Sequence, residues 1–301
     1  MRALTYTEHG GPEVLHVAAM PEPHAGPGQV RVKVTAAGIN PIDWKLVGGY
    51  MPGSEAPTEA AVPGFDAAGV VDEVGEGVSG VSVGDDVLGL GQGTQAEHAV
   101  LTAWAPKPAA LDWSVAAAAP SALETTERVL RLVGVQPGQT LFVAGGAGGV
   151  GAVLVQVAVA AGITVVASAG ADNQGYLTEI RAIPVLYGDG LVDRVRTAAP
   201  GGVDAVVDVA GKTPAADLFA IAPSHDKVIS IANFDLAAEG ALVTVGGQGE
   251  QHPVEALAQG VDLLRENKIV IKVQTFPLDR AREAYATSLS GHVRGKLVLL
   301  P

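Results

Sequence analysis

The stretch from Thr140 to Gly151 reads TLFVAGGAGGVG, an apolar strand that runs directly into a cluster of glycines. Its glycines match the pattern G-x-G-x-x-G at Gly146, Gly148 and Gly151. In that pattern the first glycine allows a tight turn, the second lets the backbone approach a pyrophosphate, and the third lets a helix pack close to the sheet. We expect the helix to begin near Gly149, where its unpaired N–H groups and positive dipole end would face phosphates.

A second apolar strand supports this interpretation. The uncharged segment 152–162 (AVLVQVAVAAG) follows the glycines, and the β-branched segment 163–170 (ITVVASAG) comes next. A tight turn without a ligand does not require this order, whereas a dinucleotide-binding unit consists of a strand, a glycine turn, a helix and a second strand. The sequence therefore predicts a dinucleotide site at this turn.

The rest of the chain contains two kinds of sequence. Residues 1–117 hold short β-type segments between glycine and proline turns, whereas apolar strands alternate with helical segments in residues 118–265. Residues 266–301 return to β character. We therefore expect an α/β protein with two domains. Residues 1–117, completed by 266–301, would form a β domain, and 118–265 a doubly wound parallel-sheet domain.

Composition and charge exclude several functions. The formal net charge is −13, from 19 Lys and Arg against 32 Asp and Glu. Nucleic acid is not an expected partner, because binding its phosphate backbone requires clustered cations. The chain has no cysteine, which excludes disulfides and thiolate zinc sites. No residue from Leu141 to Ala171 is charged, but glycines break this run into strand and helix, so we expect a cytoplasmic protein that does not enter the membrane.

Four sequence blocks point to a family: AAGINPIDWK (36–45), VPGFDAAGVVDEVGEGV (62–78), AGGAGGVG (144–151) and GHVRGKLVLL (291–300). In content and order they resemble the medium-chain dehydrogenase/reductase superfamily, and within it the zinc-free quinone oxidoreductase branch that includes zeta-crystallin. The resemblance covers nearly the whole chain. It implies a GroES-like β domain, a Rossmann nucleotide-binding domain, an active cleft between them, and a homodimer.

The chain departs from the zinc-dependent members of this superfamily at two positions. Asn40 stands where those enzymes carry a cysteine ligand, and Phe65 stands where they carry a histidine. A phenyl ring cannot ligate a metal, so the resemblance implies that no zinc is bound. Without a Lewis acid to stabilise an alkoxide, the expected reaction is hydride transfer from a reduced nicotinamide to a quinone or a small α,β-unsaturated carbonyl.

Three residues are candidates for the catalytic side of the site. The resemblance places Asn40 beside the nicotinamide, although an asparagine before proline also caps turns. Asp43 either takes part in the chemistry or anchors the local loop. Tyr50 either donates its phenolic proton to the reduced acceptor or packs as an aromatic lid. The loop 48–61, rich in Gly, Pro and Ala, is expected to shape the acceptor pocket.

The candidate cofactor residues lie in the glycine turn, at the expected carboxyl ends of the strands, and in the tail. NAD-specific members carry an acid at the end of the second strand, whereas this chain has Ala169 there, so we expect NADPH. Ser168 and Asn173 could donate to its 2′-phosphate, although the nearby Asp172 and the lack of Arg or Lys in this loop oppose the preference. His292 belongs to the tail block and is a further residue of interest. The cofactor candidates are Thr125, Gly146, Ala147, Gly148, Gly149, Val150, Gly151, Ser168, Asn173, Gly211, Ala232, Asn233, Arg294 and Lys296.

Two other functions remain open at this point. One is a reductase of enoyl thioesters in a biosynthetic pathway, which would need basic residues for a long phosphorylated arm, and the chain shows few. The other is a protein that binds NADPH without turnover and serves as a sensor or structural protein.

Overall fold

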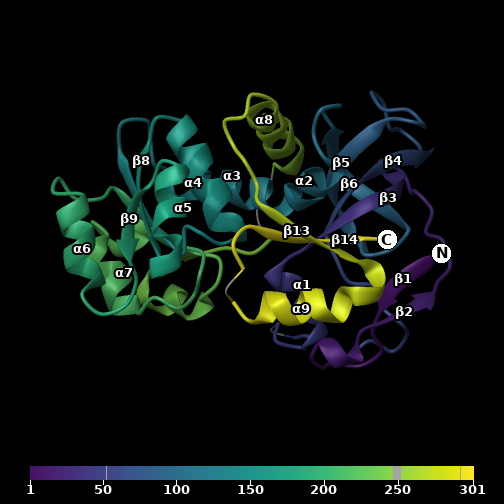
Figure 1. Ribbon diagram of the computed structural model, residues 1–301, viewed down its shortest axis with the longest axis horizontal. Coiled ribbons are helices and arrows are strands. Elements are labelled where there is room, and N and C mark those ends of the chain that lie inside the picture. Colours follow the sequence, from purple (N-terminus) through teal and green to yellow (C-terminus); the bar gives the residue numbers. More distant parts are fainter. Residues whose placement is uncertain (52, 247–251, 292) are drawn as a thin grey trace. The chain divides into compact units, whose positions relative to one another are not determined.

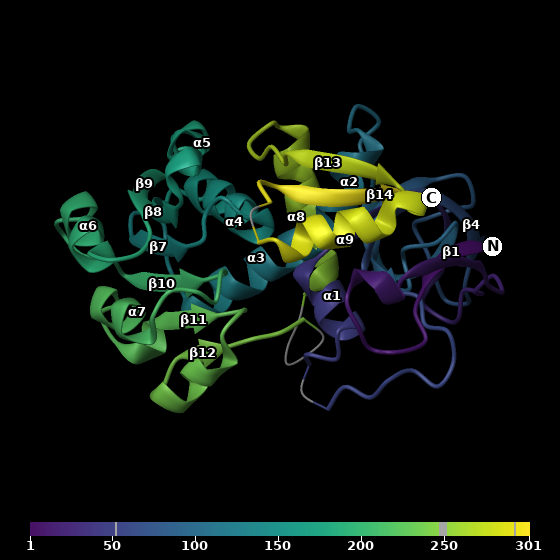
Figure 2. The ribbon, with the colours of Figure 1, turned by 60° about the horizontal axis from the view of Figure 1, so that its bottom comes forward.

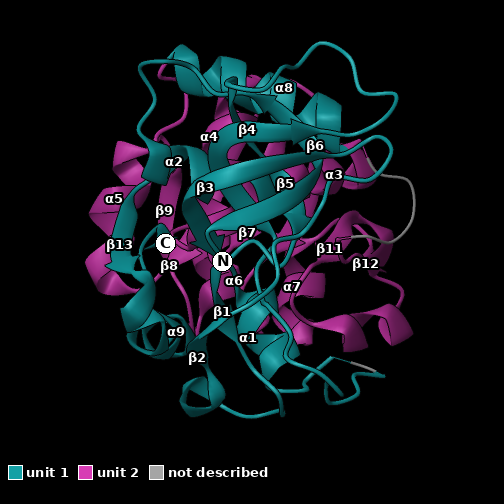
Figure 3. Ribbon diagram, turned by 90° about the vertical axis from the view of Figure 1, so that its right-hand side faces the viewer, with its two compact units in different colours: residues 1–121, 253–266, 271–301 teal, residues 122–252, 267–270 magenta. Residues whose placement is uncertain are grey.

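The computed structural model describes residues 1–51, 53–246, 252–291 and 293–301. These residues form two compact units, which Figure 3 shows in different colours. Unit 1 consists of residues 1–121, 253–266 and 271–301, and unit 2 consists of residues 122–252 and 267–270.

Unit 1 is built on a six-stranded sheet in the order β13-β14-β3-β4-β5-β6, in which β3 also pairs with β6 and so closes the last four strands into a barrel. A separate hairpin consists of β1 and β2. The C-terminal strand β14 lies antiparallel to β3, with Leu297 opposite Ile39, and can be seen beside it in Figure 1. The strands are β1 (Arg2–Thr5), β2 (His16–Ala19), β3 (Val30–Ile39), β4 (Asp66–Val74), β5 (Asp86–Gln92), β6 (His98–Pro106), β13 (Val273–Pro277) and β14 (Lys296–Leu300).

Helices cover the strands of unit 1. Helix α8 packs against β6 through its apolar side, where Leu257, Val261 and Leu264 are buried. From the sequence, residues 253–265 are expected in the nucleotide-binding domain, because an apolar stripe does not reveal which sheet a helix covers. The helical elements are α1 (Pro41–Val47), α2 (Trp113–Ala118), α8 (Pro253–Arg265), α9 (Ala281–Leu289), η1 (Pro12–Val14) and η5 (Leu278–Arg280).

Unit 2 contains a six-stranded sheet in which every pairing is parallel, in the order β12-β11-β10-β7-β8-β9. The chain runs outward from β7 to one edge through β8 and β9 and then to the other edge through β10, β11 and β12, as can be followed in Figure 2. This is the doubly wound order, in which ligands bind at the carboxyl ends where the winding reverses. The strands are β7 (Thr140–Ala144), β8 (Thr164–Ala169), β9 (Ile183–Leu186), β10 (Ala205–Asp208), β11 (Val228–Ser230) and β12 (Leu242–Val243).

Each face of this sheet has its own apolar core. Residues of α3, α4 and α5 pack on one face, where Val143 and Val165 are buried, and residues of α6 and α7 pack on the other, where Phe142 and Val166 are buried. The α/β class predicted from the sequence, with a β module and a doubly wound parallel sheet, is confirmed. The helical elements are α3 (Pro120–Val133), which begins in unit 1, α4 (Gly149–Ala160), α5 (Gln174–Glu179), α6 (Leu191–Ala198), α7 (Ala215–Ile221), η2 (Ala171–Asn173), η3 (His225–Lys227) and η4 (Phe234–Glu239).

Candidate active site and cofactor-binding turn

The glycine turn joins β7 to α4, and α4 begins at Gly149 as the sequence predicts. Gly145 has the left-handed φ of +93°, and the G-x-G-x-x-G pattern does not include it. A Cβ on Gly146 would lie 2.6 Å from the Cβ of Ala167 in β8, and one on Gly151 would lie 2.2 Å from the Gly145 carbonyl oxygen. These two positions therefore have no room for a side chain, because helix and strand approach closely.

Gly148 differs from its neighbours. A Cβ on Gly148 would meet only the Gly145 carbonyl oxygen, at 3.6 Å, so the protein itself leaves room there. Gly148 precedes the first turn of α4, which holds no acidic residue, and no side chain caps it. The N-terminus of α4 therefore presents unpaired backbone N–H groups, and the space at Gly148 lets a pyrophosphate approach them. Ala147 and Val150 belong to the same turn.

Ser168 holds the glycine turn from the neighbouring strand. Its carbonyl accepts the N–H of Gly146 at 3.0 Å, and its Oγ accepts the N–H of Gly145 at 3.3 Å. The side chain is buried, so it faces the turn rather than solvent. Asn173, which ends η2, donates its backbone N–H to Gly170.

Tyr187, which no sequence motif marks, follows the carboxyl end of β9. Its side chain is 64% exposed, and a Cβ on Gly170 would lie 3.4 Å from its ring, so the phenol stands beside the end of β8. Arg194 fixes this loop by donating to the carbonyls of Leu186, Tyr187, Gly188 and Asp189. The sequence feature that could have pointed to Tyr187 is an aromatic residue directly after a predicted parallel strand.

The carboxyl ends of β10 and β11 are joined by Asp208 and Ser230, both fully buried. Ser230 donates its hydroxyl to Asp208 at 2.8 Å, and Asp208 accepts the N–H of Gly211 at 2.9 Å. Ser230 Oγ in turn accepts the N–H groups of Ala232 and Asn233. The structure thus brings together the predicted Gly211, Ala232 and Asn233, and a Cβ on Gly211 would be only 2.9 Å from that of Ala232.

Thr125 lies on α3 beside a buried ion pair. Arg128 Nε donates to Glu124 at 2.8 Å, and its Nη1 donates to Thr244 at 2.6 Å, just past β12. The hydroxyl of Thr125 is 3.4 Å from Arg128 Nη2. Arg128 therefore links the predicted Thr125 to the loop that follows β12.

In unit 1, Asn40 lies in a buried network at the end of β3. Its Nδ2 donates to Asp66 at 2.9 Å, and its Oδ1 accepts a hydrogen bond from the Lys296 ammonium, which lies 3.6 Å from Asp66. Ser121 donates its hydroxyl to the other Asp66 oxygen. The side chains of Asn40, Asp66 and Lys296 are all buried. The polar side-chain atoms of Asn40 and Lys296 are therefore bonded to other residues of unit 1.

Asp43 is fully buried one helical turn further on. It accepts the backbone N–H of Asn40 at 2.8 Å and the side-chain amide of Gln95 at 3.1 Å, and Gln95 accepts the hydroxyl of Tyr285. The pKa of Asp43 is raised from 3.8 to about 8, chiefly by burial and also by the nearby Asp66, against the lowering effects of the Asn40 hydrogen bond, the Lys296 charge and the Gln95 amide. Asp43 is therefore mostly protonated at neutral pH and acts as a neutral hydrogen-bonding group.

Tyr50 lies at the surface beyond α1, with 68% of its side chain exposed. Its ring stands edge-on to that of Trp44, with the centroids 6.4 Å apart. It does not join the buried network of Asn40 and Asp43. Arg294 lies two residues before β14, and His292 lies outside the described residues.

The residues at the zinc-ligand positions do not fit zinc. An amide at residue 40 and a phenyl group at residue 65 replace the ligands that the zinc members carry, and the amide is bound to Asp66 and Lys296. Within the described ranges, no group of three or more His, Cys, Asp or Glu side chains is arranged to hold a metal ion. In the same part of the chain, no helix has the length and apolar character needed to cross a bilayer.

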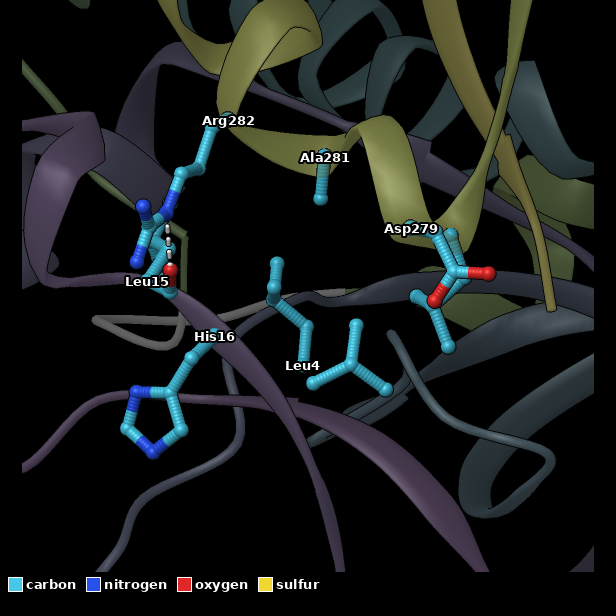
Figure 4. A pocket seen from close by; sticks show the side chains of 8 residues that line it. Leu4, Leu15, His16, Asp279, Ala281 and Arg282 are labelled. Carbon is cyan, nitrogen blue, oxygen red and sulfur yellow. Dashed lines mark hydrogen bonds between the residues drawn. The ribbon is translucent and has the colours of Figure 1, made fainter.

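A hollow of about 280 Å³ lies elsewhere in unit 1, between β2 and the start of α9 (Figure 4). Leu4 and Ala281 line it together with the polar side chains of His16, Asp279 and Arg282 (Figure 4). Polar groups do not converge on its centre, which distinguishes it from a catalytic pocket.

Comparison with known families agrees with this architecture. The chain matches the family model for the alcohol dehydrogenase GroES-like domain over residues 26–108 and that for the zinc-binding dehydrogenase over residues 185–299. A GroES-like domain followed by a nucleotide-binding parallel sheet defines the medium-chain dehydrogenase/reductase class.

Similarity to three known proteins indicates the branch of the superfamily to which the chain belongs. The chloroplast envelope quinone oxidoreductase homolog of Arabidopsis thaliana is 30% identical over 324 residues, which cover 100% of this chain and 98% of that protein. Escherichia coli quinone oxidoreductase, solved in complex with NADPH, superposes with a TM-score of 0.85 at 25% identity and full coverage of both chains. The 2-methylene-furan-3-one reductase of Solanum lycopersicum is 36% identical over 174 residues, which span 52% of this chain and 44% of that protein. The chain therefore belongs to the quinone oxidoreductase branch of the superfamily, a branch of oxidoreductases.

Proposed function

We propose that this protein transfers hydride from NADPH to a quinone or a small α,β-unsaturated carbonyl without zinc. The observation that carries the proposal is that the chain holds both an open glycine turn, in unit 2, and an amide in place of a metal ligand, at Asn40 in unit 1. The relatives support it, because one was solved with NADPH and others are named for quinone and enone substrates. An enoyl-thioester reductase and a non-catalytic sensor, which the sequence left open, are not favoured, although the chain is also 39% identical over 215 residues to the mycoketide-CoA synthase of Mycobacterium tuberculosis, of which the match spans 5%.

The residues of unit 2 fit a dinucleotide. Gly148 leaves space for a pyrophosphate in front of the N-terminus of α4, and Ser168 holds the turn in shape. Asp208 and Ser230 arrange the backbone of Gly211, Ala232 and Asn233 at the same edge of the sheet. When bound, the reduced nicotinamide supplies the hydride. The chain contributes binding and orientation.

A preference for NADPH follows from the end of β8. Ala169 presents no carboxylate to repel a 2′-phosphate, and the exposed phenol of Tyr187 stands beside the next residue, Gly170. Ser168 is directed at the glycine turn, so Tyr187 and Asn173 are the better candidates for donors to that phosphate. This proposal places no basic side chain against the 2′-phosphate, so we expect the preference for NADPH over NADH to be modest.

In this proposal, residues of unit 1 contact the quinone or enone that accepts the hydride. In a quinone or enone, conjugation spreads the negative charge that develops as hydride arrives, so the acceptor needs less electrophilic help than an alcohol or a simple ketone. Tyr50 presents a phenolic donor at the surface of unit 1. Asn40 and Asp43 are positioning residues in this proposal, since their polar atoms hold the loop before α1 in place.

We also propose that the protein is a cytoplasmic homodimer that binds small molecules rather than nucleic acid or membranes. Homodimerisation is inferred from the family. The acidic balance of the sequence, with a net charge of −13, opposes binding to phosphate backbones.

The test is NADPH oxidation, followed at its absorbance band, with ortho-quinones, para-quinones and simple enones. NADH and an added chelator serve as controls. Turnover with NADPH that survives the chelator is the expected result. Tight NADPH binding without turnover on any acceptor would overturn the proposal in favour of a thioester substrate or a sensor.

A further inference from the structure

The end of α1 carries a cluster of two rings and one cation, made of Trp44, Lys45 and Tyr50. The Nζ of Lys45 lies 5.8 Å from the centroid of the Trp44 ring, and the Tyr50 ring stands at 72° to that indole. Tyr50 donates its backbone N–H to the Lys45 carbonyl at 2.8 Å, which ties the loop to the helix. A cation and an exposed phenol therefore both lie next to one indole.

The Lys45 ammonium is partly buried without a counter-charge. Burial alone lowers its pKa, and across the part of the chain that the structure describes no carboxylate pairs with it. This contrasts with Arg31, whose guanidinium is held by Asp72 and Glu73. The contact with Trp44 is near the outer limit of a cation–π interaction and offsets little of the cost of desolvation.

An uncompensated cation of this kind attracts an anion. In a chain with a net charge of −13, acidic residues are abundant, yet none of those that the structure describes forms an ion pair with Lys45. The neighbouring Tyr50 is 68% exposed, and its phenol ring offers a flat surface on which a planar ring can stack. A ligand that satisfies both groups is planar and carries a negative charge at its edge.

We propose that Lys45 is a specificity-determining residue that favours planar acceptors bearing an anionic substituent, such as quinones with a carboxylate or sulfonate group. The ring of the acceptor stacks on Tyr50, and its anionic group pairs with the Lys45 ammonium. This inference rests on the proposed function, because it places the acceptor on the α1 side of unit 1.

The experiment compares 1,4-naphthoquinone with 1,4-naphthoquinone-2-sulfonate as acceptors for Lys45→Met, Lys45→Arg and the wild-type protein. The measured quantity is the ratio of kcat/KM for the sulfonate to kcat/KM for the neutral quinone, so the intrinsic reactivities of the two quinones cancel between variants. Lys33→Met, at an exposed position of β3, is the matched control for the loss of one positive charge.

The ratio is expected to fall about tenfold in Lys45→Met, which corresponds to the loss of one partly screened charge pair. It should stay close to the wild-type value in Lys45→Arg and Lys33→Met, and it should fall for the wild type as salt is added. An unchanged ratio in Lys45→Met, or an equal fall in Lys33→Met, would overturn the inference.

Equilibrium binding separates this inference from the proposed function. If the wild type reduces neither these two quinones nor any other quinone or enone, the proposed function fails, and quenching of tryptophan fluorescence by the two naphthoquinones without NADPH then decides the role of Lys45. Tighter binding of the sulfonate that Lys45→Met abolishes would support an anion site at Lys45. Equal binding of both quinones to the wild type would reject it.

Discussion

Lys296, the first residue of β14, donates a hydrogen bond from its ammonium to the amide oxygen of Asn40, which lies 256 positions earlier in the chain. The same amide donates to Asp66, so one residue connects the cation and the carboxylate of a buried network. In the zinc members, by resemblance, a metal ligand stands at the position of Asn40. Here hydrogen bonds and a buried ion pair hold the end of β3, the start of β4 and the start of β14 together.

Replacing Lys296 by methionine should destabilise unit 1 strongly. The Asp66 carboxylate would remain fully buried without its cation, and removing one partner of a buried pair costs about 3–5 kcal/mol. Urea unfolding monitored by circular dichroism measures the loss. Lys212→Met, at an exposed position, should change the free energy of unfolding by less than about 0.5 kcal/mol. A loss below about 1 kcal/mol in Lys296→Met would contradict the structural role of this network.

Asp43 should make the stability of the protein fall as the pH rises. Its pKa is about 8 in the folded protein and 3.8 when exposed, because the folded state buries the carboxyl. The folded state therefore holds a proton that the unfolded chain has released, and the stabilising contribution, complete below 3.8, is lost progressively up to about 8. Asp43→Asn should flatten this part of the profile, since an amide accepts the same hydrogen bonds and does not ionise.

The measurement is the free energy of urea unfolding of the wild type and Asp43→Asn at several pH values across this range. The difference between the two proteins should shift in favour of the variant with rising pH. Parallel profiles would show that Asp43 keeps an ordinary pKa in the folded state.

Local features of the fold were predictable from the sequence, whereas long-range partners were not. The start of α4 at Gly149 and the alternation around β7 depend on residues within one helix or turn. The bond between Asn40 and Lys296 depends on which strands become neighbours, and neither residue carries a local signal of that pairing. The two alternatives considered for Asn40 did not include this network.

Two further observations show the same limit. Ser168 stays a predicted donor to the 2′-phosphate, and the sequence carries no sign that its Oγ accepts the N–H of Gly145, because that contact depends on which side of β8 the side chain occupies. Tyr187 carries no motif, and its place beside Gly170 follows only from the pairing of β8 with β9.

Alanine at Gly148 and at Gly151 should separate cofactor binding from folding. At Gly151 the new Cβ would lie 2.2 Å from a backbone oxygen, so Gly151→Ala should lose about 1–3 kcal/mol of stability. At Gly148 the nearest protein atom is 3.6 Å away, so Gly148→Ala should fold normally but bind NADPH at least about tenfold more weakly. Thermal unfolding and NADPH titration by fluorescence provide the two readouts. Normal NADPH affinity in Gly148→Ala would show that the pyrophosphate does not approach this glycine.

Tyr187→Phe should reduce the preference for NADPH over NADH by about fivefold, through the loss of one hydrogen bond to the 2′-phosphate worth about 1 kcal/mol. Phenylalanine keeps the ring beside Gly170, and Arg194 still holds the loop through backbone carbonyls, so the affinity for NADH should hardly change. The measurement is kcat/KM for each cofactor at a fixed, saturating acceptor concentration. Tyr50→Phe is the matched control, because it removes a phenol from the acceptor side and should leave the cofactor ratio as in the wild type. A Tyr187→Phe protein that weakens NADH and NADPH equally would assign Tyr187 to packing of the adenosine end rather than to recognition of the phosphate.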